Sequence, residues 1–173
     1  ITQGWAGQPA WEKHFARLKA ANFGFSGDRT EHVLWRLNNG ELVGLSPKVI
    51  VIMIGTNNVG HSSSNPQQTA DGVKAIVTTL RTRIPDARIL LLGIFPRDEK
   101  PDGALRQQVA EATRLFKEAA DGKHVHFLDL APKFLNEDGS VSKEIMPDFL
   151  HLSEKGYAIW ADAIAPKIEE LMK

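Results

Sequence analysis

Cysteine is absent from the 173-residue sequence. Its absence excludes a disulfide framework and thiol catalysis, and it leaves the redox compartment undetermined. A chain of this length buries enough apolar surface to fold as one domain without a metal or a disulfide. We therefore expect an ordinary globular domain that is stabilised by its own core.

An excess of charge of one sign and a long hydrophobic run are also missing. The 21 basic and 21 acidic residues give a formal net charge of zero, and no basic run stands out. Nucleic acid is therefore not expected as the main partner. The longest apolar run covers residues 49–54, which is far too short to span a bilayer. The sequence thus predicts no membrane span.

Short apolar segments alternate along the chain with amphipathic stretches of helical length. Residues 49–54, 88–94 and 125–130 have the composition of strands covered on both faces, and residues 22–25 form a weaker fourth candidate. This alternation predicts an α/β fold in which helices cover both faces of a parallel sheet. No repeat, low-complexity tract or linker divides the chain, so residues 1–173 are expected to form one domain.

Helix signals fill the intervals between the expected strands. Apolar residues recur at helical spacing after Asn65-Pro66 and again over residues 105–116. Asn65 is a good N-cap and Pro66 a good first-turn residue, and Ser153 can cap a final helix that runs to Lys173. Shorter helices are expected over residues 9–20 and 30–39.

Unusual loops come directly after the expected strands. In parallel α/β sheets the chemistry lies at the carboxyl ends of the strands. Residues 26–29 and 55–58 each follow a strand candidate, and residues 146–152 precede the last helix. We therefore expect these three segments, which are far apart in sequence, to converge on one edge of the sheet.

Asp148 and His151 have the spacing of an acid–base pair. A carboxylate three residues before a histidine on a turn can accept a hydrogen bond from one imidazole nitrogen, which leaves the other free to take a proton. The motif is short, and a helix-start aspartate beside a surface histidine would look the same. A metal site is a further interpretation, but no second His or Cys stands at ligand spacing.

Asn57 and Asn58 follow a glycine directly after a buried strand. An amide at this position can donate a hydrogen bond to a developing oxyanion, and such a donor is typically worth about 3 kcal/mol of barrier. Gly27 could let its backbone N–H approach a ligand closely. Ordinary turn chemistry explains the same glycines and asparagines equally well.

Taken together, these segments resemble the SGNH, or GDSL-type, hydrolase superfamily. Within it the chain is most similar to the catalytic subunits of platelet-activating factor acetylhydrolase and their bacterial esterase relatives. The similarity runs from Ile1 to the final helix. The matching residues are 22–30, 32–37, 48–51, 55–58 and 148–152.

The resemblance implies a fold and a set of roles. The fold is a three-layer α/β/α sandwich with a flavodoxin-like, doubly wound parallel sheet of about five strands. Gly27 and Asn57 would be oxyanion-hole donors, His151 the base and Asp148 the residue that orients it. No metal or organic cofactor is implied. The residues expected around the substrate pocket are Asp28, Arg29, Asn58, Trp5 and His61.

The nucleophile is the remaining part of the family pattern. In the family it is the serine of a Gly-Asp-Ser block, and residues 1–4 resemble the segment directly after that serine. We therefore expect the serine immediately before Ile1, at the end of a central strand. Ser26 is an alternative, because residues 24–28 nearly form the G-x-S-x-G motif of α/β-hydrolases, although Asp28 replaces the last glycine.

The expected function is hydrolysis of short-chain acyl esters by a Ser-His-Asp triad. The loops are short and carry no inserted lid, which favours acetyl-type groups on an accessible alcohol, such as O-acetyl groups on carbohydrate. A non-catalytic binding or scaffold domain of the same fold is the alternative. The sequence does not fix the cellular compartment or the oligomeric state, and a homodimer stays open.

Overall fold

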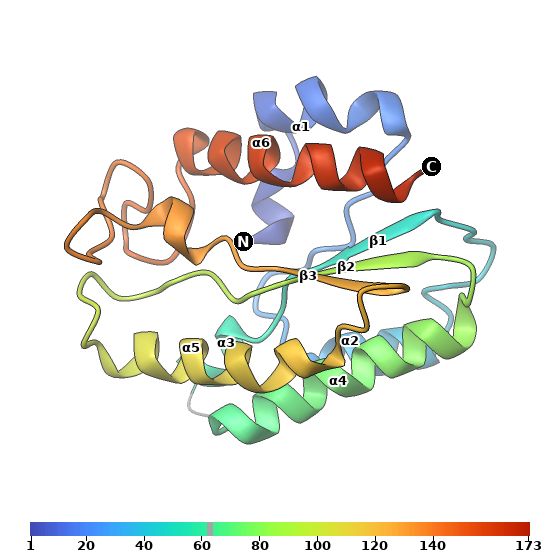
Figure 1. The fold of residues 1–173 in the computed structure, drawn as a ribbon, viewed down its shortest axis with the longest axis horizontal. Helices are drawn as coiled ribbons and strands as arrows, with labels where there is room; N and C mark the ends of the chain where they lie inside the picture. The colour runs from blue at the N-terminus through green and yellow to red at the C-terminus, as the bar shows by residue number, and fades with distance from the viewer. Residues whose placement is uncertain (62–63) are drawn as a thin grey trace.

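The structure is a computed structural model that describes residues 1–61 and 64–173. Three parallel strands form one sheet in the order β1-β2-β3: Val49–Ile52, Arg88–Leu92 and Val125–Leu128. Helices cover both faces of this sheet, as Figure 1 shows. The expected α/β class with a parallel sheet between two helical layers is therefore confirmed, whereas the described residues form three strands and about five were expected.

The central strand β2 has a side-chain pattern that joins the two layers. Leu90 and Leu92 point into the core on one face of the sheet, and Ile89 and Leu91 point into the core on the other. All four side chains are buried. This continuous apolar run is typical of a parallel strand that is covered on both sides.

One helical layer contains α1 (Pro9–His14) and α6 (Glu154–Leu171), and the other contains α2 (Thr30–Asn38), α4 (Pro66–Arg83) and α5 (Ala104–Phe116). In Figure 1, α6 is red and lies above the sheet, whereas α4 and α5 lie below it. The remaining helices are short: α3 (Thr56–Gly60), η1 (Thr2–Trp5), η2 (Ala16–Leu18), η3 (Lys117–Ala119) and η4 (Ala131–Phe134).

The two predicted helix caps are confirmed. The Asn65 side chain accepts a hydrogen bond from the Gln68 backbone N–H at 2.9 Å, and Pro66 begins α4. The Ser153 hydroxyl accepts one from the Gly156 N–H at 3.2 Å at the start of α6. Each cap satisfies a backbone donor that the first turn of a helix leaves unpaired.

Several expected boundaries differ from the structure. Residues 22–25 are extended but do not form a strand, because the described residues place no strand beside them. Their polar groups are satisfied locally instead: the Asn22 side chain donates to the Thr2 carbonyl and accepts from the Gly24 N–H. The helix expected over residues 9–20 breaks at Phe15 into α1 and η2, and α6 ends at Leu171 rather than Lys173.

A long apolar groove runs along the outer edge of β1. Among the described residues, β1 pairs only with β2, so its other edge faces this groove. The groove has a volume of about 740 Å³, and we call it the β1 groove. Its walls come from both layers, including Phe15, Leu37, Trp160 and Ile164. Val51, on β1, is 37% exposed, which is unusual for a strand in a parallel sheet with helices on both faces.

The described residues contain no helix that combines the length and the apolar character needed to cross a membrane.

Candidate active site

Asp148 and His151 lie on one tight turn that leads into α6, and we call residues 148–151 the histidine turn. The Asp148 Oδ2 atom is 2.7 Å from the His151 Nδ1 atom. The other carboxylate oxygen accepts hydrogen bonds from the backbone N–H groups of Leu150, at 3.1 Å, and His151, at 2.7 Å. One carboxylate therefore both shapes the turn and orients the imidazole, as a general base requires.

The backbone of the histidine turn is conformationally strained. Phe149 has a φ of 59°, in the left-handed region that residues other than glycine rarely adopt. Its N–H donates to the Met146 carbonyl at 2.9 Å, and its side chain packs against the core beneath α6. Strain of this kind persists only where the surrounding contacts impose it, and it is concentrated at functional sites.

The Asp148 carboxylate stays ionised over a wide pH range. Partial burial raises its pKa, but hydrogen bonds from the His151 ring and from the backbone of His151 and Leu150 outweigh burial and lower the pKa to about 2. The carboxylate is therefore negative throughout the neutral and mildly acidic pH range. It can hold the ring nitrogen in one tautomer and stabilise the imidazolium that forms when the ring takes a proton.

A second turn follows β1, and we call residues 55–58 the asparagine turn. Gly55 has a φ of 120°, and a Cβ there would lie 2.8 Å from the Ile94 Cδ1 atom and 3.0 Å from the Thr69 Cγ2 atom. Any other residue is disfavoured at this position, because its backbone conformation would be strained and its Cβ would press on Ile94 and Thr69. The glycine lets the chain turn sharply at the end of the strand and present the next residues at the sheet edge.

Asn57 and Gly27 lie on neighbouring loops. The Asn57 Nδ2 group donates to the Asp28 carbonyl at 2.8 Å, which joins the asparagine turn to the loop that carries Gly27. That bond fixes the amide plane and uses one of its two N–H groups, so the other remains to donate. Gly27 has a φ of 76°, and within residues 1–61 and 64–173 no acceptor contacts its N–H. Two hydrogen-bond donors therefore lie on adjacent loops at the carboxyl end of β1.

A family of known proteins matches most of this sequence. The model of the GDSL-like lipase/acylhydrolase family matches residues 1–159. The chain belongs to this family.

One relative in sequence is the human platelet-activating factor acetylhydrolase IB subunit alpha1. The two sequences are 45% identical over 148 residues, and this alignment covers 85% of this chain and 62% of the human protein. The chain thus spans less than two thirds of the length of this relative. A GDSL-like lipase from Bacteroides thetaiotaomicron has a similar fold, with a TM-score of 0.82, 21% identity, and coverage of 98% of this chain and 84% of the other. An acetyl-xylooligosaccharide esterase from Geobacillus gives a TM-score of 0.74 at 20% identity, covering 95% and 78%.

Three residues expected around the pocket of this GDSL-like protein make contacts that stabilise its loops. The Asp28 side chain pairs with Arg36, and Arg29 pairs with Glu31 at 2.8 Å. Asn58 is buried and connects the two loops: its side-chain oxygen accepts from the Thr30 N–H at 3.0 Å. These side chains support the loops that carry Gly27 and Asn57, and their contact with a substrate stays a prediction.

The remaining candidates occupy different environments. Trp5 is buried and stacks on Trp160 with ring centroids 3.7 Å apart, although it also lines the β1 groove. His61 is exposed at the end of α3. Ser26 is exposed on the loop before Gly27. No hydrogen bond within the described part of the chain joins Ser26 to His151, as the alternative triad would require.

Sequence reasoning missed one residue beside the site, Arg97. It follows β2, and its guanidinium donates to the Thr56 carbonyl at 2.8 Å. Thr56 lies directly before Asn57 on the asparagine turn. The only sequence signal was position, since Arg97 follows the carboxyl end of a buried strand, where functional loops gather.

Proposed function

We propose that this protein is a serine ester hydrolase that acts on short-chain acyl esters. In this proposal His151 is the general base, Asp148 orients it, and Gly27 and Asn57 donate to the oxyanion. The observation that carries the proposal is the 2.7 Å contact between Asp148 and His151. Arg97 links this pair to the asparagine turn, because it interacts electrostatically with Asp148 and donates to the Thr56 carbonyl. Membership of the GDSL-like family supports ester hydrolysis as the reaction class.

The nucleophile in this proposal is a serine directly before Ile1, at the end of a strand that fills the β1 groove. Three features support that strand. The outer edge of β1 has backbone groups that a parallel neighbour would pair, the groove walls are mainly apolar, and the exposed Val51 side chain would be covered. With this strand, residues 1–173 would complete a single SGNH-type domain.

The direction of the groove agrees with this placement of the serine. Lys48 lines the end of the groove near the start of β1, and Ile1, Asp28 and Asn57 line the other end. A strand parallel to β1 would therefore finish beside the two oxyanion donors. The Tyr157 hydroxyl donates to the Ile1 carbonyl at 2.7 Å, which anchors the residue after the proposed serine to α6.

The proposed mechanism is built from these positions. The serine Oγ attacks the ester carbonyl carbon while His151 Nε2 takes the hydroxyl proton, and His151 Nδ1–H keeps its hydrogen bond to Asp148. The N–H groups of Gly27 and Asn57 stabilise the oxyanion of the tetrahedral intermediate. His151 then returns the proton to the leaving alcohol, and water, activated by the same histidine, releases the acyl group.

A short acyl group on an accessible alcohol is the proposed substrate, with O-acetyl groups on carbohydrate as the preferred class. The histidine turn supports this choice, because the side chains of Asp148 and His151 are 56% and 62% exposed and a bulky alcohol could approach them. The name of the Geobacillus fold neighbour, an acetyl-xylooligosaccharide esterase, agrees with that class. A substrate with a short acyl group does not require a deep, enclosed pocket for a lipid chain.

A chain-length series of p-nitrophenyl esters tests the proposed function. The full-length protein should hydrolyse the acetyl and propionyl esters fastest, and His151→Ala should remove the activity. A rate that rises steadily for acyl chains beyond about eight carbons would contradict the short-chain specificity, because each added methylene would then gain binding energy in an apolar pocket. Absence of hydrolysis across the series would contradict esterase function itself.

A further inference from the structure

Arg97 has no role in the mechanism proposed above, but its side chain contacts the asparagine turn. Its Nη1 atom donates to the Thr56 carbonyl at 2.8 Å and contacts the Thr56 hydroxyl at 3.3 Å. The peptide group that contains this carbonyl also contains the Asn57 nitrogen. A shift of the Thr56 carbonyl therefore moves the backbone that carries the proposed oxyanion donor.

The loop that carries Arg97 is itself fixed on both sides. The Arg106 Nε atom donates to the Arg97 carbonyl at 2.7 Å, and its Nη2 atom donates to the Asp98 carbonyl at 2.6 Å. Asp98 has a φ of 64°, and its carboxylate accepts from the N–H groups of Leu105, at 3.1 Å, and Arg106, at 3.2 Å. Aspartate rarely adopts this left-handed backbone conformation, so the contacts around Asp98 impose it.

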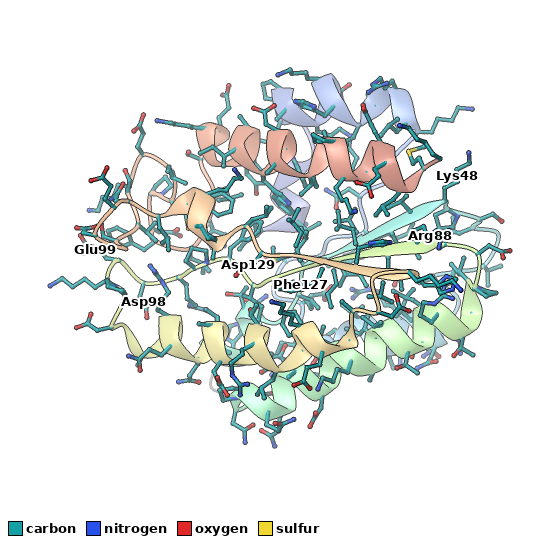
Figure 2. All side chains as sticks on the ribbon, viewed as in Figure 1. Lys48, Arg88, Asp98, Glu99, Phe127 and Asp129 are labelled. Atoms are coloured by element: carbon teal, nitrogen blue, oxygen red, sulfur yellow. The ribbon has the colours of Figure 1, made fainter. Side chains whose placement is uncertain are left out.

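The same Arg106 side chain reaches toward the histidine turn. Its Nη1 atom donates to the Gly139 carbonyl at 3.1 Å, and the Val141 N–H donates to the Glu99 carbonyl at 2.8 Å. Residues 139–141 lie in the segment that leads to Asp148. Figure 2 shows Asp98 and Glu99 at the end of the molecule opposite Lys48 and Arg88, beyond the carboxyl ends of the strands. The Arg97 loop thus contacts the segments that lead to both turns of the site.

The Arg97 side chain is partly buried, and a neighbouring glycine leaves space for its guanidinium. Burial lowers its pKa, and the carboxylates of Asp98 and Asp148 act in the opposite direction. A Cβ added at Gly60, on the last turn of α3, would overlap the Arg97 Nη1 atom. The missing side chain at Gly60 therefore leaves the space that the guanidinium occupies.

We infer that Arg97 is a positioning residue for ester hydrolysis, which fixes the asparagine turn so that Asn57 meets the oxyanion. The inference rests on the proposed function. Arginine suits this role because its planar guanidinium presents several N–H donors in fixed directions, whereas lysine presents one mobile ammonium group. Misplacing a catalytic group by about 1 Å can cost about 100-fold in rate, so loss of this contact should affect turnover more than substrate binding.

Two variants test the inference by independent routes. Arg97→Gln removes the guanidinium, and Gly60→Ala keeps it but pushes it away from Thr56, at a site where alanine favours the helix. Arg83→Gln is the matched control, because Arg83 also donates to a backbone carbonyl, that of Leu37 at 2.8 Å, on the remote end of α4. Both test variants should lower kcat by about 10- to 100-fold with KM nearly unchanged, and the control should keep wild-type kcat.

A structural readout separates this inference from the proposed function. In nitrogen-15 NMR spectra, the Asn57 side-chain amide and the Asn57 backbone amide should shift and broaden in Arg97→Gln and Gly60→Ala, but not in Arg83→Gln. If the wild type hydrolyses no ester, the proposed function fails. If the wild type is active and both test variants keep its kcat and its Asn57 signals, the positioning role is overturned. Should Arg97→Gln fail to fold, Gly60→Ala alone decides between these outcomes.

Discussion

The histidine turn and the asparagine turn lie at the same end of the sheet, but they are held in opposite ways. The histidine turn is stabilised mainly within itself, since Asp148 contacts residues two and three positions later and both side chains are exposed. The asparagine turn is held from outside. Its contacts come from the loop after residue 27, from the Arg97 loop and from the apolar side chain of Ile94.

This difference predicts that substitutions in the two turns affect the reaction and the stability of the fold to different degrees. A substitution of Asp148 or His151 should change the reaction and leave the fold nearly intact, because both side chains are exposed and contact mainly each other. A substitution in the asparagine turn should affect both, because this turn is where the loops after β1 and β2 meet. Substitutions and pH can test that separation, from the largest expected effect to the smallest.

The largest effect is expected from Asp148→Asn. The asparagine can still accept the backbone N–H groups, but it cannot hold the imidazole in the right tautomer, so kcat should fall by about 10,000-fold. Thermal unfolding should change by only a few degrees. Asp162→Asn is the matched control, because Asp162 also pairs with a histidine, His14, at 2.9 Å on the far side of α6. Loss of activity in the control, or full activity in Asp148→Asn, would contradict the assignment.

Gly55→Ala should destabilise the fold as well as reduce activity. The new methyl group would contact Ile94 and Thr69 in a backbone conformation that disfavours any side chain. We expect the free energy of unfolding to fall by about 3 kcal/mol, measured by urea denaturation.

Gly122→Ala is the control for that measurement. Gly122 has a left-handed φ of 69°, but nothing lies within 4 Å of its added Cβ. It should therefore lose only the conformational part, about 1 kcal/mol. Equal losses in the two variants would mean that packing at Gly55 contributes nothing.

The smallest effect concerns pH. The Asp148 pKa is lowered to about 2 in the folded protein, so its carboxylate contributes stability above its unfolded pKa of 3.8, and this contribution disappears as the pH falls toward 2. Because the side chain is more than half exposed, we expect only about 1 kcal/mol or less. The stability difference between wild type and Asp148→Asn should be constant above pH 5 and shrink below pH 4. A difference that grows in acid would contradict the lowered pKa.

The same contrast explains how much the sequence could predict. The histidine turn was predictable because its partners stand three residues apart, so one short motif contains the whole contact. The class of fold was predictable for a similar reason, since the apolar runs of β1, β2 and β3 and the caps at Asn65 and Ser153 are local signals. Residues 22–25 were predicted as a strand and are not one, because a strand depends on a neighbour that no local pattern reveals.

The contacts around the asparagine turn could not be predicted. Arg97 and Thr56 are separated by 41 positions, and Asn57 and Asp28 by 29. Nothing in the local sequence of either partner indicates the other. The same holds for the stacking of Trp5 on Trp160, 155 positions away, and a contact of Trp5 with substrate stays a prediction. Long-range packing decides such positions, and single-sequence patterns contain little information about it.

The most direct test of the proposed site is to find the residue that a reactive phosphonate labels. The full-length protein would be treated with a fluorophosphonate, digested and analysed by mass spectrometry. The proposal predicts one labelled serine, immediately before Ile1-Thr2-Gln3-Gly4, and loss of the label in His151→Ala. A label on Ser26, or ester hydrolysis without any labelled serine, would contradict it.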